Sequence, residues 1–471
     1  MNRADWSLAL RNLLRNRRRS ISTLAALAIG LAAILLFSGF KANLGYTMLT
    51  AYARTGGHLQ VQHRDYFLYG SGNPTAYGIA DYEGLVQALR RDPVLKPLVY
   101  VVTPMLRFGG LAGNFDAGIS RTVIGTGLVA ADVQRMREWN EYQVPVLRPN
   151  FPLLGAPPDG AIVGVGLARV LQLCEQLHLK SCHKPQAQAA AAVQPRGPAL
   201  PSDIADLAQS EQDSTAGPDA KPGARIELLS SSARGAPNVA GLDVIAAEDQ
   251  GFKELDEISV IVQLAQAQRL VFGRDNPRVT AIMIMLNRTA DEARAAQRVR
   301  EILGQRGGGQ PLVVRTFEDL NPFYVQSDRM FDVIFRFIFV LIGGIVLFTV
   351  GNTMNTAVVE RTVEIGTLRA IGLRQAGIRR LFVIEGFILG CVGALAGLLA
   401  ANALGALVNH SGLTWLPPGS SEQLPLQLRV MGNLGTVAAT TLGLVVIATA
   451  SAWWPAWRAA NLKVVEALRH A

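Results

Sequence analysis

Four long apolar runs constrain this chain more than any other feature of its sequence. They cover residues 21–40, 337–357, 381–408 and 433–455. Because an α-helix needs about 20 apolar residues to cross the hydrocarbon core of a bilayer, each run predicts a membrane-spanning helix. The first run is longer than the apolar core of a secretory signal, and no small-x-small cleavage site follows it before Lys41, so we interpret it as an uncleaved anchor.

The charge distribution predicts how these helices are oriented. Residues 1–20, 358–380 and 456–471 together carry 14 Lys and Arg residues and 4 Asp and Glu residues, whereas the whole chain has a net charge of +9. The rule that positive loops stay inside places these three segments in the cytoplasm, and residues 41–328 and 409–432 outside. The basic balance therefore orients the chain in a membrane. It does not indicate nucleic-acid binding, because the outer segment has no basic excess.

Residues 41–328 alternate between strand-like and helix-like patterns and predict an α+β domain. The expected strands cover residues 98–106, 121–127, 255–264 and 279–287. A helix is expected over 81–93 with Asp81 as its N-cap, and another over 289–303 capped by Thr289 or Asp291. The predicted fold class is a membrane protein with four transmembrane α-helices and a large α+β extracytoplasmic domain inserted between the first and second helices.

Residues 183–225 break this pattern, because they are rich in Ala, Pro, Gln, Ser and Asp and poor in bulky apolar side chains. Such a segment buries too little surface to offset the entropy of ordering, so we interpret it as a flexible insertion. The alternative is an element that docks a partner.

The chain has three cysteines. Cys174 and Cys182 lie in the predicted outer domain, where a short disulfide loop is a candidate and two unpaired thiols are the alternative. Cys391 lies in the third apolar run and is interpreted as a small packing residue. His178 and His183 are close to the cysteine pair in sequence, but without a C-x-x-C spacing we predict no metal site.

The sequence lacks the usual motifs of catalysis. It contains no G-x-x-x-x-G-K-[ST] phosphate loop, no H-E-x-x-H and no G-x-S-x-G. The triplet of glycines at 307–309 follows a predicted helix and is interpreted as its end. We therefore predict that the chain is not an enzyme, that it has no catalytic residue, and that it holds no cofactor of its own.

Charged residues and glycines near the apolar runs have simple interpretations. Asp332, Arg336 and Glu385 lie near the ends of predicted spans, where we interpret them as interfacial anchors. Two Gly-x-x-x-Gly pairs in the third run predict close packing of that helix against a neighbour. These glycines are Gly386, Gly390, Gly393 and Gly397.

The stretch ERTVEIGTLRAIG, from Glu360 to Gly372, predicts a short amphipathic helix at the cytoplasmic surface. Ile365, Leu368 and Ile371 recur at helical spacing, and Gly372 can end the helix in a left-handed conformation. A second helix is expected to begin near Arg374 and to continue into the third span. On residue pattern alone, an interfacial loop with orienting arginines remains an alternative.

The chain resembles the FtsX-like permease superfamily, close to its MacB and LolC/LolE branch. The stretch ERTVEIGTLRAIGLRQAGIRRLFVIEGFILGCVGALAG resembles the family segment E-R-x-x-E-I-G-x-x-R-A-x-G and the glycine-rich span after it. LALRNLLRNRRRSISTLAALAIG (8–30) resembles the family's cytoplasmic helix and first span. AWRAANLKVVEALRH (456–470) resembles the family ending, although Val464 replaces its usual proline. The 183–225 insertion has no counterpart in the family pattern.

This resemblance implies a permease in the bacterial inner membrane that works with a separate ABC ATPase, which holds the ATP and Mg. It implies that the coupling region contains Glu360, Arg361, Glu364, Gly366, Arg369 and Gly372. A second permease chain is expected, either identical or related, and a periplasmic adaptor or lipoprotein is a candidate partner in addition to membrane lipid.

The cargo implied by the resemblance is amphiphilic, such as lipoproteins, peptides or small molecules. The stretch GGHLQVQ (56–62) favours the lipoprotein-releasing branch. The alternative function is an FtsX-like mechanotransducer that regulates a periplasmic partner without transporting cargo.

Overall fold

The computed structural model forms two units, which we describe separately. It describes residues 3–15, 17–70, 72–144, 150–179, 224–232, 235–251, 253–273, 276–306, 309–416 and 423–462. The membrane unit consists of Met1–Leu49, Pro322–Trp415 and Leu424–Ala471, and the outer unit of Thr50–Asn321 and Leu416–Gln423.

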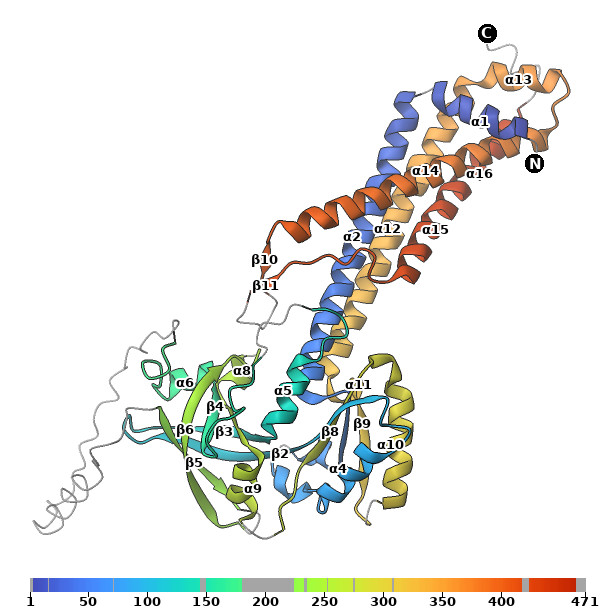
Figure 1. Cartoon of the computed structure of the whole chain (residues 1–471). Coiled ribbons are helices and arrows are strands. Elements are labelled where there is room, and N and C mark those ends of the chain that lie inside the picture. Colours follow the sequence, from blue (N-terminus) through green and yellow to red (C-terminus); the bar gives the residue numbers. More distant parts are fainter. Residues whose placement is uncertain are drawn as a thin grey trace, which may run out of the picture. The chain divides into compact units, whose positions relative to one another are not determined.

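The membrane unit is built from helices (Figure 1). They are α1 (Arg3–Arg15), α2 (Arg17–Gly56), α12 (Pro322–Glu360), α13 (Thr362–Ala370), α14 (Gln375–His410), α15 (Leu434–Ser451) and α16 (Trp453–Ala460). A two-stranded pair joins β10 (Thr414–Trp415) to β11 (Leu424–Pro425). Among the described residues, four helical stretches are long and apolar enough to cross a membrane, which confirms the four spans predicted from hydropathy. The chain is therefore a multi-pass membrane protein.

The helices α2 and α12 extend beyond the apolar runs from which they were predicted. They contain 40 and 39 residues, respectively. They contact each other along their length: the hydroxyls of Thr23 and Thr353 lie 3.0 Å apart, and the rings of Phe37 and Phe335 stack with centroids 6.4 Å apart. Hydropathy identifies only the apolar part of such a helix, because its polar ends carry no span signal.

The glycines of α14 allow two neighbouring helices to approach closely. A Cβ at Gly386 would lie 2.6 Å from the Cβ of Ala452, at the end of α15, and Gly390 also packs against α15. Gly393 and Gly397 face α2 instead, and a Cβ at Gly397 would lie 2.8 Å from a backbone oxygen of that helix. Each Gly-x-x-x-Gly pair thus faces a different helix, and α14 packs between α2 and α15.

The outer unit combines strands and helices. The strands are β1 (Leu59–His63), β2 (Val99–Asn114), β3 (Ile119–Leu128), β4 (Gly160–Gly164), β5 (Arg225–Ser231), β6 (Pro237–Glu248), β7 (Ser259–Gln263), β8 (Ala281–Leu286) and β9 (Leu312–Thr316). The α-helices are α3 (Tyr66–Tyr69), α4 (Tyr82–Arg91), α5 (Ala130–Glu138), α6 (Val165–Val170), α8 (Lys253–Asp256), α9 (Leu264–Phe272), α10 (Glu292–Arg306) and α11 (Phe317–Leu320), with 3₁₀ turns η1 (Pro74–Tyr77) and η2 (Thr289–Asp291).

The strands form one sheet in the order β3-β7-β4-β6-β5-β2-β8-β1-β9, and β2 also pairs with β3. This last pairing closes a ring of six strands. The long strand β2 makes this possible, because its first part pairs with β8 while its second part pairs with β3 and β5. The strand β2 therefore belongs both to the ring and to the open part of the sheet.

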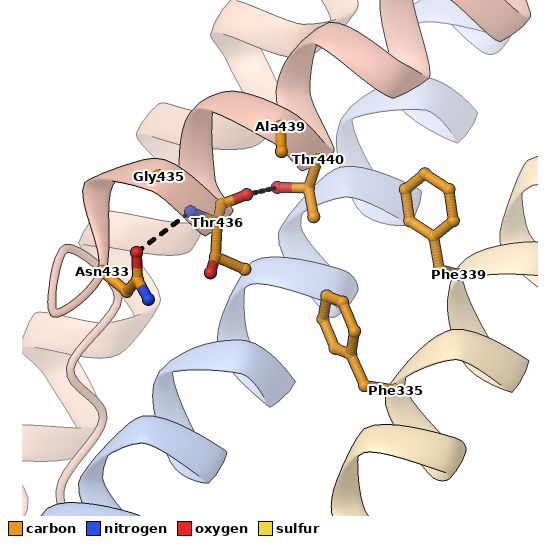
Figure 2. Close-up of a pocket in the computed structure, with 7 residues that line it drawn as sticks. All are labelled: Phe335, Phe339, Asn433, Gly435, Thr436, Ala439 and Thr440. Atoms are coloured by element: carbon orange, nitrogen blue, oxygen red, sulfur yellow. Dashed lines mark hydrogen bonds between the residues drawn. The ribbon is translucent and has the colours of Figure 1, made fainter.

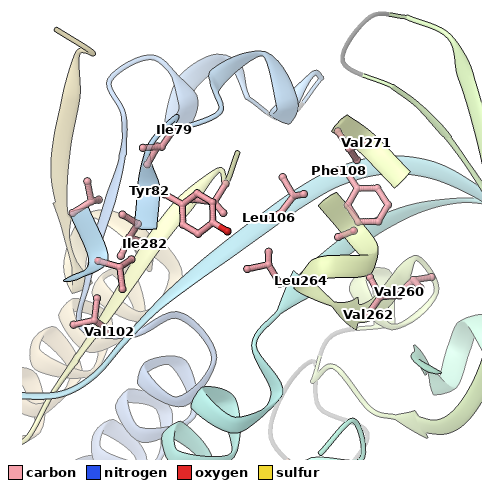
Figure 3. Packing of buried hydrophobic residues seen from close by; sticks show 14 of the residues in the cluster. Ile79, Tyr82, Val102, Leu106, Phe108, Val260, Val262, Leu264, Val271 and Ile282 are labelled. Atoms are coloured by element: carbon pink, nitrogen blue, oxygen red, sulfur yellow. The ribbon is translucent and has the colours of Figure 1, made fainter. Parts of the chain in front are cut away.

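One hydrophobic cluster fills the outer unit, and Figure 3 shows part of it. Phe108 on β2 is fully buried, and its cross-strand partner on β3 is Gly125. A Cβ at Gly125 would lie 2.2 Å from Cζ of the Phe108 ring. The ring therefore occupies the space above the glycine, and only glycine fits at this position.

Several local predictions for the outer unit need correction. Residues 255–264 are not one strand, because α8 ends at Asp256 and β7 begins at Ser259. Asp81 does precede α4, but its φ is 49° and its side chain makes no capping hydrogen bond. Neither Thr289 nor Asp291 begins a single helix, because both belong to a 3₁₀ turn that precedes α10. In the first and third cases, a single helical turn interrupts a pattern that looks continuous in sequence.

A buried histidine joins three segments of the outer unit. His58 is completely inaccessible to solvent. Its Nδ1 accepts a hydrogen bond from the backbone N–H of Leu286 (3.2 Å), and its Nε2 lies 3.2 Å from Oγ1 of Thr289. That hydroxyl in turn donates to Glu141 (2.9 Å). Burial lowers the pKa of His58 to about 4, because the charged ring would lose its hydration.

The cysteines are only partly described. Cys174 is disulfide-bonded, whereas Cys182 lies outside the described residues, so their pairing stays a prediction. Residues 180–223, which contain His183 and nearly all of the 183–225 insertion, also lie outside them, as do 307–308 and 463–471. Cys391 is a free thiol and is exposed on the described chain, so it is not the packing residue that we expected.

The contact between Phe108 and Gly125 predicts a stability effect. Gly125→Ala would place a methyl group within the buried ring, and such overpacking costs about 1–3 kcal/mol. We expect faster hydrogen exchange of the amides in β2 and β3, measured on the full chain. Gly109→Ala is the matched control, because a Cβ there meets no atom within 4 Å. Equal exchange in both variants would contradict this account of the packing.

His58 predicts a pH dependence of stability. Its folded pKa of about 4 lies below the ordinary histidine value of 6.5, so the unfolded chain takes up a proton first as the pH falls. The stabilisation is complete above about pH 6.5 and is lost as the pH falls towards about 4. His58→Gln keeps one donor and one acceptor but does not titrate. We expect the protection of β8 amides, corrected for the intrinsic exchange rate at each pH, to fall less between pH 7 and pH 5 in this variant than in the wild-type chain. The same fall in both would show that His58 is not responsible.

Candidate functional site

The end of the membrane unit that the charge distribution predicts to be cytoplasmic is organised around the break between α12 and α13. The long helix α12 ends at Glu360, and Arg361 leaves the helical conformation with φ −105° and ψ 17°. The backbone continues almost without a gap, because the N–H of Ile365 donates to the carbonyl oxygen of Arg361 (2.9 Å). The break therefore redirects the chain at a single residue, and α13 begins directly after it.

Arg361 and Glu385 form a buried ion pair at this break. Nη1 of Arg361 lies 3.1 Å from Oε1 of Glu385, and only 1% of Glu385 is exposed. Asn12 on α1 completes the contact. Its side-chain amide nitrogen donates to the same Glu385 oxygen (2.7 Å), and its backbone carbonyl oxygen accepts from Nη2 of Arg361 (2.9 Å). Three segments that are far apart in sequence, α1, the α12–α13 break and α14, are thus held at one point.

Two further ion pairs tie the same region to the N-terminal helices. Nη2 of Arg19 lies 2.5 Å from Glu360, and Nη2 of Arg15 lies 2.6 Å from Glu364. Both pairs are substantially exposed, so solvent screens them and each contributes little to stability. The pair of Arg15 with Glu364 joins α1 to α13, and the pair of Arg19 with Glu360 joins α2 to the end of α12.

The end of α13 has the features of a Schellman motif. Gly372 has φ +103°, which glycine adopts without strain. The N–H of Leu373 donates to the carbonyl oxygen of Leu368 (3.0 Å), and the N–H of Gly372 donates to that of Arg369 (3.1 Å). The helix α14 begins at Gln375, two residues after Leu373. The chain therefore reverses through a tight, hydrogen-bonded turn.

The remaining candidate residues of α13 face the interior. Gly366 is buried, and Nη1 of Arg369 donates to the backbone oxygen of Leu462. Of the three apolar residues expected on one face, Ile365 is buried but Ile371 is 80% exposed. Leu373 is also exposed. The turn between α13 and α14 consequently presents an apolar tip, which we define as Ile371 and Leu373.

The sequence interpretation located this region but missed its central contact. Glu385 was expected to be an interfacial anchor, whereas it is buried and paired with Arg361. Asp332 does lie at a helix surface, where Nζ of Lys41 contacts it. Asn12 carried no signal, because an asparagine within a basic segment is common. A buried glutamate near the start of an apolar span was the one available clue, since such a residue needs a partner.

Within the part of the chain that the structure describes, no group of three His, Cys, Asp or Glu side chains could hold a metal ion. The site consists of ion pairs, a buried amide contact and an exposed apolar tip.

Comparison with known proteins identifies this part of the chain. Residues 334–464 match the family described as FtsX-like permease C-terminal. A macrolide export ATP-binding/permease protein MacB from Nitrobacter winogradskyi is 29% identical over 212 residues, which cover 44% of this chain and 30% of that protein. The lipoprotein-releasing system transmembrane protein LolC from Xylella fastidiosa is 25% identical over 230 residues, which cover 47% of this chain and 53% of LolC.

A solved structure of the periplasmic region of MacB from Actinobacillus actinomycetemcomitans is also similar. It is 10% identical, covers 57% of this chain and 94% of its own, and has a TM-score of 0.30, which is too low to support an argument about fold. The matched parts span about half or less of the two curated relatives. The family match contains α13 and most of the buried contact described above. Residues 334–464 therefore match the FtsX-like permease C-terminal domain, and parts of the chain are similar to MacB and to LolC.

Proposed function

We propose that this chain is the permease subunit of an ABC transporter in the bacterial inner membrane. A separate ATPase would dock on the apolar tip at Ile371 and Leu373, and its closure would move the membrane helices. The observation that carries this proposal is the combination of an exposed tip with a rigid attachment. The tip follows α13 directly, and the buried contact of Arg361 with Glu385 holds the start of α13 to α14.

An exposed apolar tip on a charged surface indicates a protein partner. Ile371 is among the most exposed large apolar residues of the described chain, and Leu373 lies two positions further on. Three arginines surround them in sequence: Arg369, Arg374 and Arg379. Apolar residues with arginine nearby are enriched at the centres of protein interfaces, so this composition suits docking on a partner with an apolar pocket and an acidic rim.

The charged residues of the region have a different task in this proposal. Glu360 and Glu364 already pair with Arg19 and Arg15, so their carboxylates are engaged within the chain. Glu364 would transmit movement of α13 to α1, and Glu360 would transmit movement of the end of α12 to α2, whereas the tip would make the first contact with the ATPase. The membrane helices would then move the outer domain, which we place in the periplasm, to extract or export amphiphilic cargo such as lipoproteins, peptides or small molecules.

Substitution of the tip tests whether the ATPase docks there. Ile371→Glu removes an apolar contact and adds a charge, so we expect the ATPase to co-purify severalfold less well and its turnover in the complex to fall. Gln375→Glu is the control, because it adds the same charge in the same turn and removes no apolar side chain. The measurement is ATPase content and vanadate-sensitive hydrolysis of tagged protein from native cells. A stable complex with normal turnover in Ile371→Glu would contradict docking at the tip.

A charge exchange separates internal transmission from direct contact with the ATPase. Glu364→Arg places the new arginine next to Arg15, and the two like charges repel each other. We expect this variant to lower ATP-dependent transport while the ATPase stays bound. Arg15→Glu combined with Glu364→Arg restores the ion pair in reverse, because the two side chains lie 2.6 Å apart. We expect this double variant to regain most of the activity. If it stays as inactive as Glu364→Arg, the carboxylate of Glu364 acts on the ATPase and not through Arg15.

A further inference from the structure

A groove lies between α12 and α15 in the membrane unit, with a volume of about 490 Å³ (Figure 2). Phe335 and Phe339 of α12 form one wall. The start of α15 forms the other, where Gly435 and Ala439 offer almost no side chain. This volume falls within the roughly 300–1,000 Å³ of typical small-molecule sites. The proposed function makes no use of this groove.

The groove is closed towards the cytoplasm. The ring of Phe339 packs on α15 so closely that a Cβ at Gly443 would lie 3.0 Å from its Cζ. Below this contact, a Cβ at Gly343 would lie 3.1 Å from Cδ1 of Ile447. The two helices therefore touch from this level inward and separate only around the start of α15. Phe335 is also fixed from behind, because it stacks on Phe37 of α2.

A cluster of charges indicates the depth of the groove in the membrane. Nζ of Lys41 contacts Asp332 and lies 3.4 Å from Asp328, and such charges belong at the level of the lipid headgroups. Phe335 and Phe339 follow Asp332 by three and seven residues, which places them roughly 4.5 and 10.5 Å deeper along the helix. The groove thus begins where lipid esters lie and ends among the acyl chains of the outward leaflet.

Two polar groups at the start of α15 are available to a ligand. Oδ1 of Asn433 accepts from the N–H of Thr436 (3.1 Å), and the hydroxyl of Thr440 donates to the carbonyl oxygen of Thr436 (2.8 Å). The amide nitrogen of Asn433 and the hydroxyl of Thr436 make no hydrogen bond with any residue that the structure describes. Both can donate to an ester or phosphate oxygen.

We propose that the α12–α15 groove binds one acyl chain of a membrane glycerolipid, with Asn433 and Thr436 donating to its ester or phosphate oxygens. The chain lies against the two phenylalanine rings and ends where Phe339 meets α15. This occupant matches the depth, the apolar walls and the polar group at the outer end. A second copy of the protein would match the apolar walls alone. Val340 and Phe348 of α12 are exposed and do not line the groove, so they serve as an internal comparison.

Photolabelling tests this site on the full chain. The protein is placed in nanodiscs of phosphatidylcholine that contain a small fraction of phosphatidylcholine with a diazirine in one acyl chain, and labelled peptides are mapped by mass spectrometry. We expect labelling at 335–339 and 435–440 to exceed that at Val340 and Phe348. Ala439→Phe fills the groove and is expected to lower this labelling severalfold. Ala450→Phe is the matched control, because Ala450 is exposed about three turns further along α15 and lies outside the groove.

Each other outcome overturns the proposal. Even labelling along α12 that Ala439→Phe does not change would show ordinary contact with bulk lipid. Crosslinks between two chains at the groove, with no lipid label, would show that a second copy occupies it. A diazirine fatty acid that labels more strongly than the phospholipid would show that a free acid, and not an ester, is recognised. Hydrogen exchange of α14 in Ala439→Phe checks that the helices remain packed.

Discussion

The cytoplasmic end of this protein depends on the buried ion pair between Arg361 and Glu385. Two charges removed from water are tolerated only if each finds its partners, and here Asn12 supplies an additional donor and acceptor. Because the three residues belong to different segments, the full set of contacts forms only when α1, the α12–α13 break and α14 have come together. The pair therefore specifies one arrangement of these helices in a way that apolar packing alone would not.

The helix α14 connects this pair to the rest of the membrane unit. Its glycines bring it against α15 on one side and α2 on the other, with backbone contacts too close for any side chain. Interiors packed in this way deform little, so a displacement at Glu385 is passed to both neighbours. The ion pair holds α14 to the break before α13, and the glycines hold α14 close to α2 and α15. Force applied at α13 would reach α2 through α14 and through α1.

Sequence reasoning succeeded where one property acts over many residues and failed where single contacts decide. Hydropathy was sufficient for the four spans, because a bilayer imposes length and apolarity on each of them. It could not identify the partners of Glu385. Arg361 is 24 positions away from Glu385 in sequence, and Asn12 is further away still. The pattern Ile365, Leu368 and Ile371 suggested one apolar face, but Gly372 ends the helix there and leaves Ile371 exposed. The strand expected over 255–264 failed because a one-turn helix occupies its first residues.

The exposed and buried ion pairs of the site suit opposite tasks. The pairs of Arg15 with Glu364 and Arg19 with Glu360 lie in water, where each partner can also be solvated, so they can open and re-form at little cost. Opening the pair of Arg361 with Glu385 would leave a charge unpaired inside the protein, which is far less favourable. A movement of α13 would therefore break the outer pairs before the inner one. If docking of the ATPase moves α13 as we propose, the buried pair would hold the start of α13 in place while the exposed pairs open.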